Sequence, residues 1–496
     1  MTRRSISVLL VLCLVANLMS CYSMKTHEYK GVPPTLTDYD SIVVHTKDGK
    51  TQTFVNGMVI DRNFVGKDDQ GKVTKIPTDE ISYVELTRKE MSTGVKVLAI
   101  VGAATLGTVL LLATVVIATS CPQISSFDGE HWVLEAEPNG GAITKTTEYT
   151  DHNVLRHLRA LPGGTYRIRL ETNLDEIDFT DEIKLLAVDH PTPAEVIPDI
   201  HGNLLAISKI NRPDYAMTDT GIDLLKEFNA KGELFWDGDI RKQEYDKNHP
   251  RDEIQLKFKK PEGSRHGVLV LKGSSTFWSM YIMADFLSKF GKSAAERFER
   301  LETDPDGRAK IARFMEKSGC YIDVLVKNND DWMNAGYLKT AGTYVPKTQA
   351  LQLDLPDDSA GMVEVKLRYA PFFWNIQDLG MSFSYGDDSL QVTELVPLEA
   401  IDAKGADVKG MLMAKDESYY RTEKGDFAEM SFPVPPLVEG LERTLVLKTS
   451  GYYNLILDKD REMPFLAKTW QAVKMQGIDG YSLERFREIQ QRAGYR

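Results

Sequence analysis

The sequence predicts a mainly β protein with helical insertions: a small SH3/Sm-like β-barrel, one hydrophobic helix, and then a large antiparallel β-sandwich-like region. Short segments that alternate apolar and polar residues recur along the chain, and Gly, Pro and Asp-Gly turn signals separate them. A single long apolar stretch without charges divides the early segments from the later ones. Because 496 residues exceed what one hydrophobic core usually serves, we expect several domains.

The composition narrows the classes of partner. With 42% hydrophobic and 27% charged residues, the chain is typical of a globular protein whose membrane contacts are confined to short segments. Its formal net charge of -12 would repel phosphate backbones, and no long run of Lys and Arg offsets it. We therefore expect no nucleic-acid partner.

Residues 1–20 have the three-part plan of a secretory signal peptide. Arg3 and Arg4 form a basic start, and an apolar core runs over 6–18. The tetrapeptide LMSC, which ends at Cys21, resembles the lipobox of bacterial lipoproteins, in which the cysteine is acylated. The resemblance implies a lipid, palmitate included, on Cys21 and a place in the bacterial cell envelope. The alternative is an uncleaved membrane anchor, for which the apolar run is short.

A linker over 21–38 and a small β-module over 39–90 are expected next. The module holds short alternating segments that end at turn signals such as Asp48-Gly49. Strands this short and closely spaced predict an SH3-like or Sm-like barrel, and the module contains no catalytic constellation. The segments are SIVVHT, TQTFVNG, MVIDRNFVG, KVTKIP and ISYVELT.

A hydrophobic helix of membrane-spanning grade is expected over 95–120. The stretch from Val97 to Thr119 carries no charged residue, and as a helix it would be about 35 Å long, enough to cross a bilayer. Gly102 and Gly107 permit close contact with another helix. The alternative is a buried core helix, although such helices seldom run this far without a polar face.

The side of the membrane on which the large region lies follows from two signals that disagree. If Cys21 lies outside the cytoplasmic membrane and the helix spans that membrane, the rest of the chain returns to the cytoplasm. However, Arg88, Lys89 and Lys96 precede the helix, and the next basic residue is Lys145. The positive-inside rule therefore places the C-terminal side outside, and we expect a periplasmic location for it.

Period-two apolar runs return after residue 120 and predict antiparallel sheets of the sandwich type. We divide this region into a first β-rich part over 121–262 and a second over 263–460. Helical spacing of apolar residues predicts an insert over 276–317, and the chain is expected to end in helices over 461–496. The clearest alternating sets are Tyr166, Ile168 and Leu170; Ile254, Leu256 and Phe258; Val363, Val365, Leu367 and Tyr369; and Leu445 with Leu447.

Three phrases of the large region are similar to recurring segments of uncharacterised bacterial envelope proteins. They are Cys-Pro at 121–122 with FDGEHW at 127–132, NLDEIDF at 173–179, and TSGYY at 449–453. The resemblance covers most of 121–455. It implies an envelope setting and carries no known reaction.

Cys121 and Cys320 are the cysteines that would remain beside Cys21 after the signal peptide is removed. In an exported protein they are the one possible intrachain disulfide. Two isolated buried thiols are the alternative, because nothing in the sequence brings these positions within bonding distance.

The phrase DIHGNL, which begins at Asp199, resembles the first metal-binding motif of calcineurin-like metallophosphoesterases. There an Asp and a His at i and i+2 hold one ion of a two-metal site that activates water. The resemblance implies that Asp199 and His201 would be metal ligands. The other motifs of that family are incomplete in this sequence, and the alternative is a polar turn between two strands.

Aromatic residues offer one further site. Phe372, Phe373 and Trp374 could stack on sugar rings or form a binding surface for a partner. The alternative is that they fill the core, as aromatics in β-rich domains usually do.

These observations favour a membrane-anchored envelope lipoprotein whose β-rich domain binds or supports another component, an envelope protein or a glycan. No complete catalytic set is found in the sequence, and no cofactor is expected. The alternative function is a metal-dependent hydrolase, phosphoesterase-like, that uses Asp199 and His201.

Overall fold

The computed structural model describes residues 22–30, 41–54, 56–60, 63–68, 72–91, 121–174, 176–229, 236, 238, 251–288, 300–356, 361–387, 389–455 and 478–489. The predicted signal peptide, Cys21 and the predicted hydrophobic helix lie outside these residues. Within the described ranges, no helix is both long enough and apolar enough to cross a membrane. The chain forms two compact units, Met1–Ala113 and Thr114–Arg496, which are described separately.

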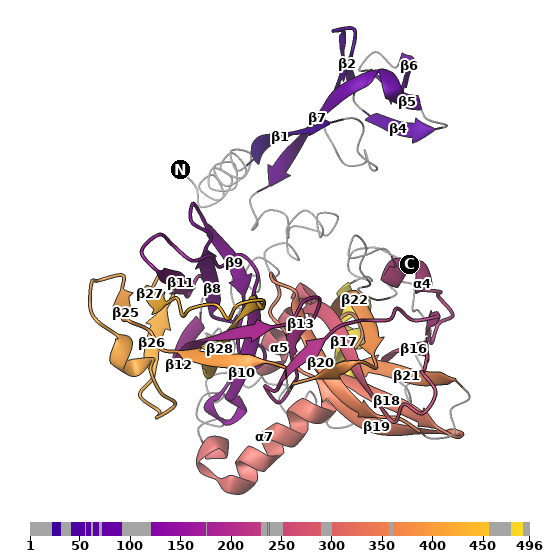
Figure 1. The fold of residues 1–496 in the computed structure, drawn as a ribbon. Helices are drawn as coiled ribbons and strands as arrows, with labels where there is room; N and C mark the ends of the chain where they lie inside the picture. The colour runs from indigo at the N-terminus through magenta and orange to yellow at the C-terminus, as the bar shows by residue number, and fades with distance from the viewer. Residues whose placement is uncertain are drawn as a thin grey trace, which may run out of the picture. The chain divides into compact units, whose positions relative to one another are not determined.

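The prediction of a mainly β protein is confirmed, since 51% of residues lie in strands and 15% in helices (Figure 1). The strands form several antiparallel sheets. Short 3-10 helices join some of them: η1 (Thr78–Glu80), η2 (Lys145–Thr147) and η4 (Lys409–Met411).

The small unit has two antiparallel sheets, with strand orders β1-β7-β2-β3 and β4-β5-β6. Its strands are β1 (Tyr22–Lys30), β2 (Ser41–Thr46), β3 (Thr51–Phe54), β4 (Asn56–Ile60), β5 (Asn63–Lys67), β6 (Val73–Pro77) and β7 (Ile81–Met91). One core serves both sheets and contains Ile42, Val44, Phe54, Phe64, Ile76, Ile81 and Val84. The two-sheet arrangement is what the structure shows, and barrel closure stays a prediction.

Two details of the small unit differ from the sequence prediction. The segment MVIDRNFVG contributes two strands, β4 and β5, which pair Ile60 with Asn63. The expected linker over 21–38 was wrong in its first part, because residues 22–30 form β1. This strand pairs along the whole of β7, from Tyr22 with Met91 to Lys30 with Tyr83.

The large unit contains a sandwich of two sheets. Their orders are β10-β28-β12-β24, with β26 also paired to β12, and β25-β27-β11-β8-β9. The strands are β8 (Gln123–Phe127), β9 (Trp132–Ala136), β10 (Tyr149–Leu155), β11 (Thr165–Glu171), β12 (Glu176–His190), β24 (Gln391–Leu395), β25 (Glu399–Asp402), β26 (Tyr420–Glu423), β27 (Phe427–Pro433) and β28 (Glu442–Leu455). We call these strands the sandwich.

The chain between β12 and β24 forms three more sheets, which we call the inserted part. Their orders are β13-β14-β23, β15-β16-β21-β18-β19 and β20-β17-β22. The strands are β13 (Glu195–Pro198), β14 (Leu204–Ile207), β15 (Tyr215–Thr218), β16 (Asp252–Lys259), β17 (His266–Ser275), β18 (Ile322–Asn328), β19 (Asp331–Leu338), β20 (Lys347–Asp354), β21 (Met362–Tyr369), β22 (Trp374–Ser382) and β23 (Tyr385–Gly386).

This nesting corrects the expected division of the large region at 262/263. The sandwich takes its strands from both ends of the region, and β16 of the first expected part pairs with β21 of the second. The inserted part leaves the sandwich after His190 and returns at Gln391, whose ladder partner is Asp189. Its entry and exit therefore lie side by side on the sandwich.

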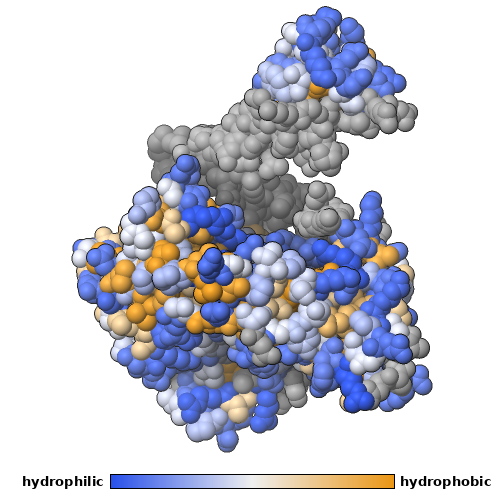
Figure 2. All heavy atoms as spheres, in the orientation of Figure 1, coloured by the Kyte–Doolittle hydropathy of each residue, from blue (hydrophilic) through white to orange (hydrophobic). Residues whose placement is uncertain are grey.

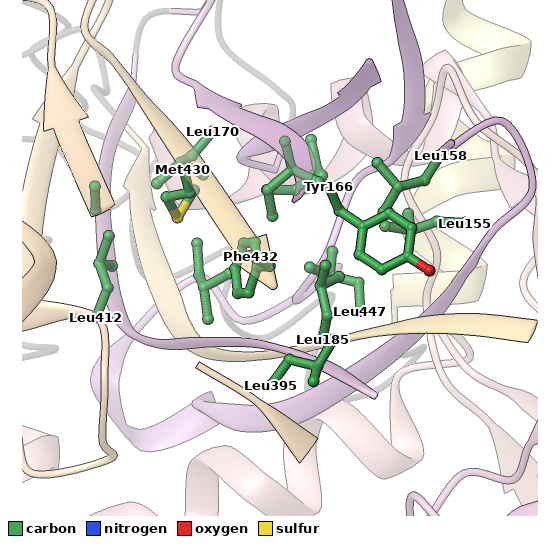
Figure 3. Packing of buried hydrophobic residues seen from close by; sticks show 14 of the residues in the cluster. Leu155, Leu158, Tyr166, Leu170, Leu185, Leu395, Leu412, Met430, Phe432 and Leu447 are labelled. Atoms are coloured by element: carbon green, nitrogen blue, oxygen red, sulfur yellow. The ribbon is translucent and has the colours of Figure 1, made fainter. Parts of the chain in front are cut away.

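The core of the sandwich confirms the prediction of strands in which every second residue is buried. Alternate residues of β11 are buried, and Tyr166, Ile168 and Leu170 face a cluster that also contains residues of β12 and β28. Figure 3 shows Tyr166, Leu170, Met430 and Phe432 lying near Leu185, Leu395 and Leu447. The alternating sets that begin at Ile254 and Val363 are buried in β16 and β21 of the inserted part.

Strand β12 has both of its faces buried. Leu185 and Ala187 belong to the core of the sandwich, whereas Leu186 and Val188 pack with Val196 of the inserted part. The segment IKLLAV in β12 is nearly all apolar for this reason, and its one polar residue, Lys184, is partly exposed.

Within the predicted insert over 276–317 the structure has two described helices, α5 (Phe277–Ser288) and α7 (Pro305–Lys317). A further short helix, α4, spans Leu225–Asn229. Helix α7 begins after Asp304, which caps it and accepts a hydrogen bond from the Asp306 amide at 3.2 Å. Pro305 occupies the first turn, where its missing N–H costs nothing.

The chain's last described segment, 478–489, is helical, as predicted. Ser482 lies inside this helix and is fully buried. Its hydroxyl accepts a hydrogen bond from the Trp278 indole at 2.7 Å, which ties the helix to α5.

Large hydrophobic side chains also reach the surface of the large unit, where Figure 2 shows hydrophobic groups among hydrophilic ones. Most of them lie at or near β24 and β25, the edge strands of the two sandwich sheets. They are Val392, Val396, Leu398, Ile401, Met411, Met413, Leu437 and Val438.

Strands β12 and β28 lie so close together at Gly451 that a larger residue there would clash. A Cβ at this position would lie 2.4 Å from the Phe179 carbonyl oxygen, next to the register shift between Thr180 and Glu182. Gly451→Ala is therefore expected to lower the free energy of unfolding by about 1–3 kcal/mol, measured by chemical denaturation. Gly163→Ala, with no atom within 4 Å of the new Cβ, is the control and should change it by less than about 0.5 kcal/mol. Equal effects of the two substitutions would contradict this account.

Candidate functional site

The three aromatic residues proposed as a surface are buried, so that prediction is corrected. Phe372 is 7% exposed, Phe373 1% and Trp374 0%. The Trp374 indole donates a hydrogen bond to the Cys320 carbonyl at 3.1 Å, and the Phe372 ring packs against Phe486. These rings fill the core and present no face to a ligand in solution.

Asp199 and His201 lie in the turn between β13 and β14. One Asp199 carboxylate oxygen accepts hydrogen bonds from the backbone amides of His201 and Asn203, each at 2.8 Å. The other oxygen accepts from the Asn203 side chain at 2.8 Å, and the His201 side chain is exposed. The arrangement is that of a polar turn. Within the described ranges, no group of three or more His, Cys, Asp and Glu is placed to hold a metal ion.

Cys121 and Cys320 are both buried, and neither is in a disulfide. They nevertheless line the same small cavity, which lies under α5 and α7. The fold thus brings together two positions that the sequence alone could not relate.

The strongest candidate site is a pocket of about 180 Å³ between the sandwich and the inserted part. Strands β9 and β10 provide its sandwich side, and β17 and the start of β20 provide the other side. Junctions of this kind are frequent places for ligand sites. The lining residues are Leu134, Glu135, Ala136, Glu137, Asn153, Val154, Arg156, His157, Lys272, Val345, Pro346, Lys347 and Thr348. We call it the glutamate pocket.

Glu135 is held in the pocket wall by the segment that follows β10. Its Oε1 accepts hydrogen bonds from the backbone amides of Arg156 at 2.5 Å and His157 at 2.7 Å. The His157 Nδ1 lies 3.0 Å from the same oxygen. Although the Glu135 side chain is only 4% exposed, its Oε2 has no hydrogen-bond partner within the protein.

Glu137 is held by the loop that precedes β20. Its Oε2 accepts hydrogen bonds from the backbone amides of Tyr344 at 2.6 Å and Val345 at 2.7 Å. Gly342 allows this approach, because a Cβ there would lie 2.3 Å from the Glu137 Cβ. The second oxygen, Oε1, is buried without a hydrogen-bond partner.

Burial raises the pKa of Glu137 from its ordinary value of 4.5 to about 7, against the lowering effect of the backbone amides of Val345, Tyr344 and Thr343. Near neutral pH this carboxyl group therefore exchanges between its acid and ionised forms. A strongly perturbed carboxyl group in a pocket is a physical mark of a functional site.

Cationic groups complete the lining. Arg156 forms a 2.6 Å ion pair with Glu195 and keeps more than half of its side chain exposed. Lys347 pairs with the buried Asp151, which also accepts a hydrogen bond from the Asn139 amide at 2.9 Å. Burial opposes ionisation of Asp151, but Lys347 and these hydrogen bonds hold its pKa below the ordinary value. The pocket can thus offer both acceptors and donors to a polar ligand.

The sequence reasoning missed this pocket, although one signal was present. Glu135 and Glu137 stand two residues apart in the phrase VLEAEP, a spacing that places two side chains on one face of a regular strand, although in the structure β9 has a register shift at Glu135. The partners that bury them come from 342–348, and no local pattern relates these segments.

No family model and no curated protein matches the chain. Among solved structures, 27 chains match it. They include the VP2 protein of infectious bursal disease virus in T=1 particles, at 8% identity and a TM-score of 0.14, with 96% of this chain and 92% of that chain covered. Another is a structure of the Gt strain of the same virus, at 8% identity and a TM-score of 0.14, with 95% and 91% covered. At these TM-scores the similarity carries no argument about fold or function.

The raised pKa of Glu137 makes stability depend on pH. The folded chain holds this proton more tightly than the unfolded chain, so the free energy of unfolding falls as pH rises from about 4.5 to 7. Its contribution to that fall is on the order of 3 kcal/mol. In Glu137→Gln, which cannot ionise, this part of the fall should vanish, measured as the difference between variant and parent at pH 5 and pH 8. The comparison isolates Glu137, because Asp178, whose pKa burial also raises to about 7, is common to both proteins. A difference that does not change with pH would contradict the assignment.

Proposed function

We propose that this chain is an exported, membrane-anchored binding protein whose glutamate pocket recognises a short glycan. The supporting observation is that two residues of the pocket lining, Glu135 and Glu137, each have one buried carboxylate oxygen, Oε2 and Oε1 respectively, without a hydrogen-bond partner in the protein. Buried acceptors of this kind are costly unless a donor reaches them. Sugar hydroxyl and amino groups are donors of the right kind.

The other lining residues suit the same ligand class. Arg156, Lys272 and His157 supply donors for ring, acetamido or carboxylate oxygens of a sugar. A volume of about 180 Å³ is below that of sites for drug-sized ligands, so the pocket would take a small group such as one sugar unit. The anchoring part of the proposal rests on the sequence, namely the lipobox resemblance at Cys21.

Binding can be tested by titrating the full chain, purified in detergent, with N-acetylglucosamine oligomers and, separately, with maltotriose. Glu135→Gln and Glu137→Gln keep the size of the side chains and replace an acceptor with a donor. Each is expected to weaken binding at least about tenfold, which corresponds to the loss of one charge-assisted hydrogen bond. Glu439→Gln, at an exposed position away from the pocket lining, should leave binding unchanged. If neither sugar series binds, or if all three variants bind alike, the pocket proposal fails.

The anchor needs an experiment of its own. In a bacterial host fed labelled palmitate, the chain should incorporate label and Cys21→Ser should not. The variant should also keep its signal peptide, since lipobox cleavage follows acylation of the cysteine. Label retained in Cys21→Ser would place the lipid elsewhere or remove the lipoprotein assignment.

The raised pKa of Glu137 favours a second candidate function at the same pocket, which is general acid catalysis on a glycosidic bond. A carboxyl group that is half protonated near pH 7 can donate a proton to a leaving oxygen, and a second carboxylate lies two residues away. Release of shorter sugars during the titration, lost in Glu137→Gln, would favour catalysis over binding.

A further inference from the structure

The cavity shared by Cys121 and Cys320 has an unusual lining. It measures about 40 Å³ and its wall is largely apolar. Five of its lining residues contain sulfur, and they come from four separate segments of the chain: Cys121 before β8, Met280 and Met283 on α5, Met315 on α7, and Cys320 before β18.

Separate contacts hold Cys121 and Cys320 in position at the cavity. The Cys320 thiol lies 3.8 Å from the Met283 sulfur. The Cys320 carbonyl oxygen is held by the Trp374 indole, and its amide donates to the Ser318 hydroxyl at 3.2 Å. Cys121 is hydrogen-bonded through its sulfur to Tyr453, whose hydroxyl also accepts from the Gly141 amide at 3.3 Å. Both cysteines are thus fixed in position by groups of the core.

The chemistry of this lining selects one class of ion. Thiolate and thioether ligands together favour soft cations such as Cu(I), whereas structural zinc sites use four Cys or His ligands, and calcium uses oxygen. Within the described ranges no set of three His, Cys, Asp and Glu is arranged for a metal ion, so harder cations find no ligand set here. Methionine sulfur atoms would supply the remaining ligands of the ion.

Two carboxylates act on the cavity in a way that favours a positive charge. Burial raises the pKa of the Cys121 thiol well above its ordinary value, and the negative charges of Glu137 and Glu176 raise it further. Burial also raises the pKa of Cys320 to about 11. Both groups are therefore neutral thiols at pH 7. Burial, the largest cause, disfavours any ion here, whereas the charges of Glu137 and Glu176 favour a positive one.

We propose that this cavity is a binding site for one Cu(I) ion, with Cys121, Cys320 and Met283 as ligands and Met280 and Met315 beside it. One of the two cysteine thiols gives its proton to water, and the resulting thiolate forms a Cu–S bond. The oxidation states of copper and sulfur do not change. Because binding releases a proton, affinity should rise with pH. The site is independent of the glycan proposal, since the two cavities share no lining residue.

The test is an anaerobic competition between the reduced full chain and bicinchoninate for Cu(I), followed by the absorbance of the bicinchoninate complex. One equivalent of Cu(I) should be retained, and Zn(II) should not be. Cys121→Ser and Cys320→Ser are expected to lower the affinity about 100-fold, and Met283→Leu about tenfold. Met333→Leu, at a methionine that is 55% exposed, is the control and should bind as the parent does.

Met283→Leu keeps the volume of the side chain, so it separates ligation from folding if the cysteine variants fail to fold. X-ray absorption of the copper-loaded chain should show sulfur ligands alone. Retention of no copper, or equal retention by a Cys121→Ser/Cys320→Ser double variant, would overturn the proposal. So would peptide mass spectrometry that finds Cys121 and Cys320 joined as a disulfide in the unreduced chain.

Discussion

The pairing of β12 with β28 is the constraint on which the large unit depends. The ladder runs from Glu176 with Leu455 to His190 with Glu442, and it joins an early strand of the unit to the last of its described strands. Strands β10, β24 and β26 attach to this pair, so one entire sheet is organised around it. Because alternate residues of β12 face the sandwich core and the inserted part, the same ladder also holds these two parts together.

The glutamate pocket is a product of that junction. Glu135 and Glu137 belong to the sandwich, but the amides that hold Glu137 belong to a loop of the inserted part. Each carboxylate gives one oxygen to backbone amides, and its other oxygen is buried without a hydrogen-bond partner in the protein. Two buried acidic groups that are only half satisfied cost stability, and proteins usually retain such an arrangement where a ligand or a reaction uses it.

Local patterns predicted most of the strands because each buried face repeats every second residue. The sets at Tyr166, Ile254 and Val363 were correct for this reason. The start of α7 could also have been predicted, since Asp304-Pro305 is a helix-capping signal in the sequence, whereas the spacing of apolar residues does not show it. Domain boundaries were not readable, because β12 and β28 carry no mark that they are partners.

The functional residues show the same contrast between what local sequence patterns predict and what depends on tertiary packing. The turn at Asp199 could be anticipated as an alternative from its Asp, Gly and Asn residues, whereas the burial of Phe372 and Trp374 depends on packing with distant segments. The pairing of Glu137 with the loop at 342–345 and the meeting of Cys121 with Cys320 are tertiary facts. A single sequence contains the groups but not their neighbours.

The nested order of strands has a consequence for how the chain is made. During synthesis β10 and β12 leave the ribosome long before β28. Their hydrogen-bonding edges and the two apolar faces of β12 therefore stay unpaired while the inserted part is synthesised. Contacts between segments so distant in sequence form slowly, and waiting strands are prone to pair with other chains. The inserted part can assemble its own sheets during that interval. Completion of the sandwich then coincides with the arrival of β28, so the pairing of this late strand is the step that commits the sandwich to its fold.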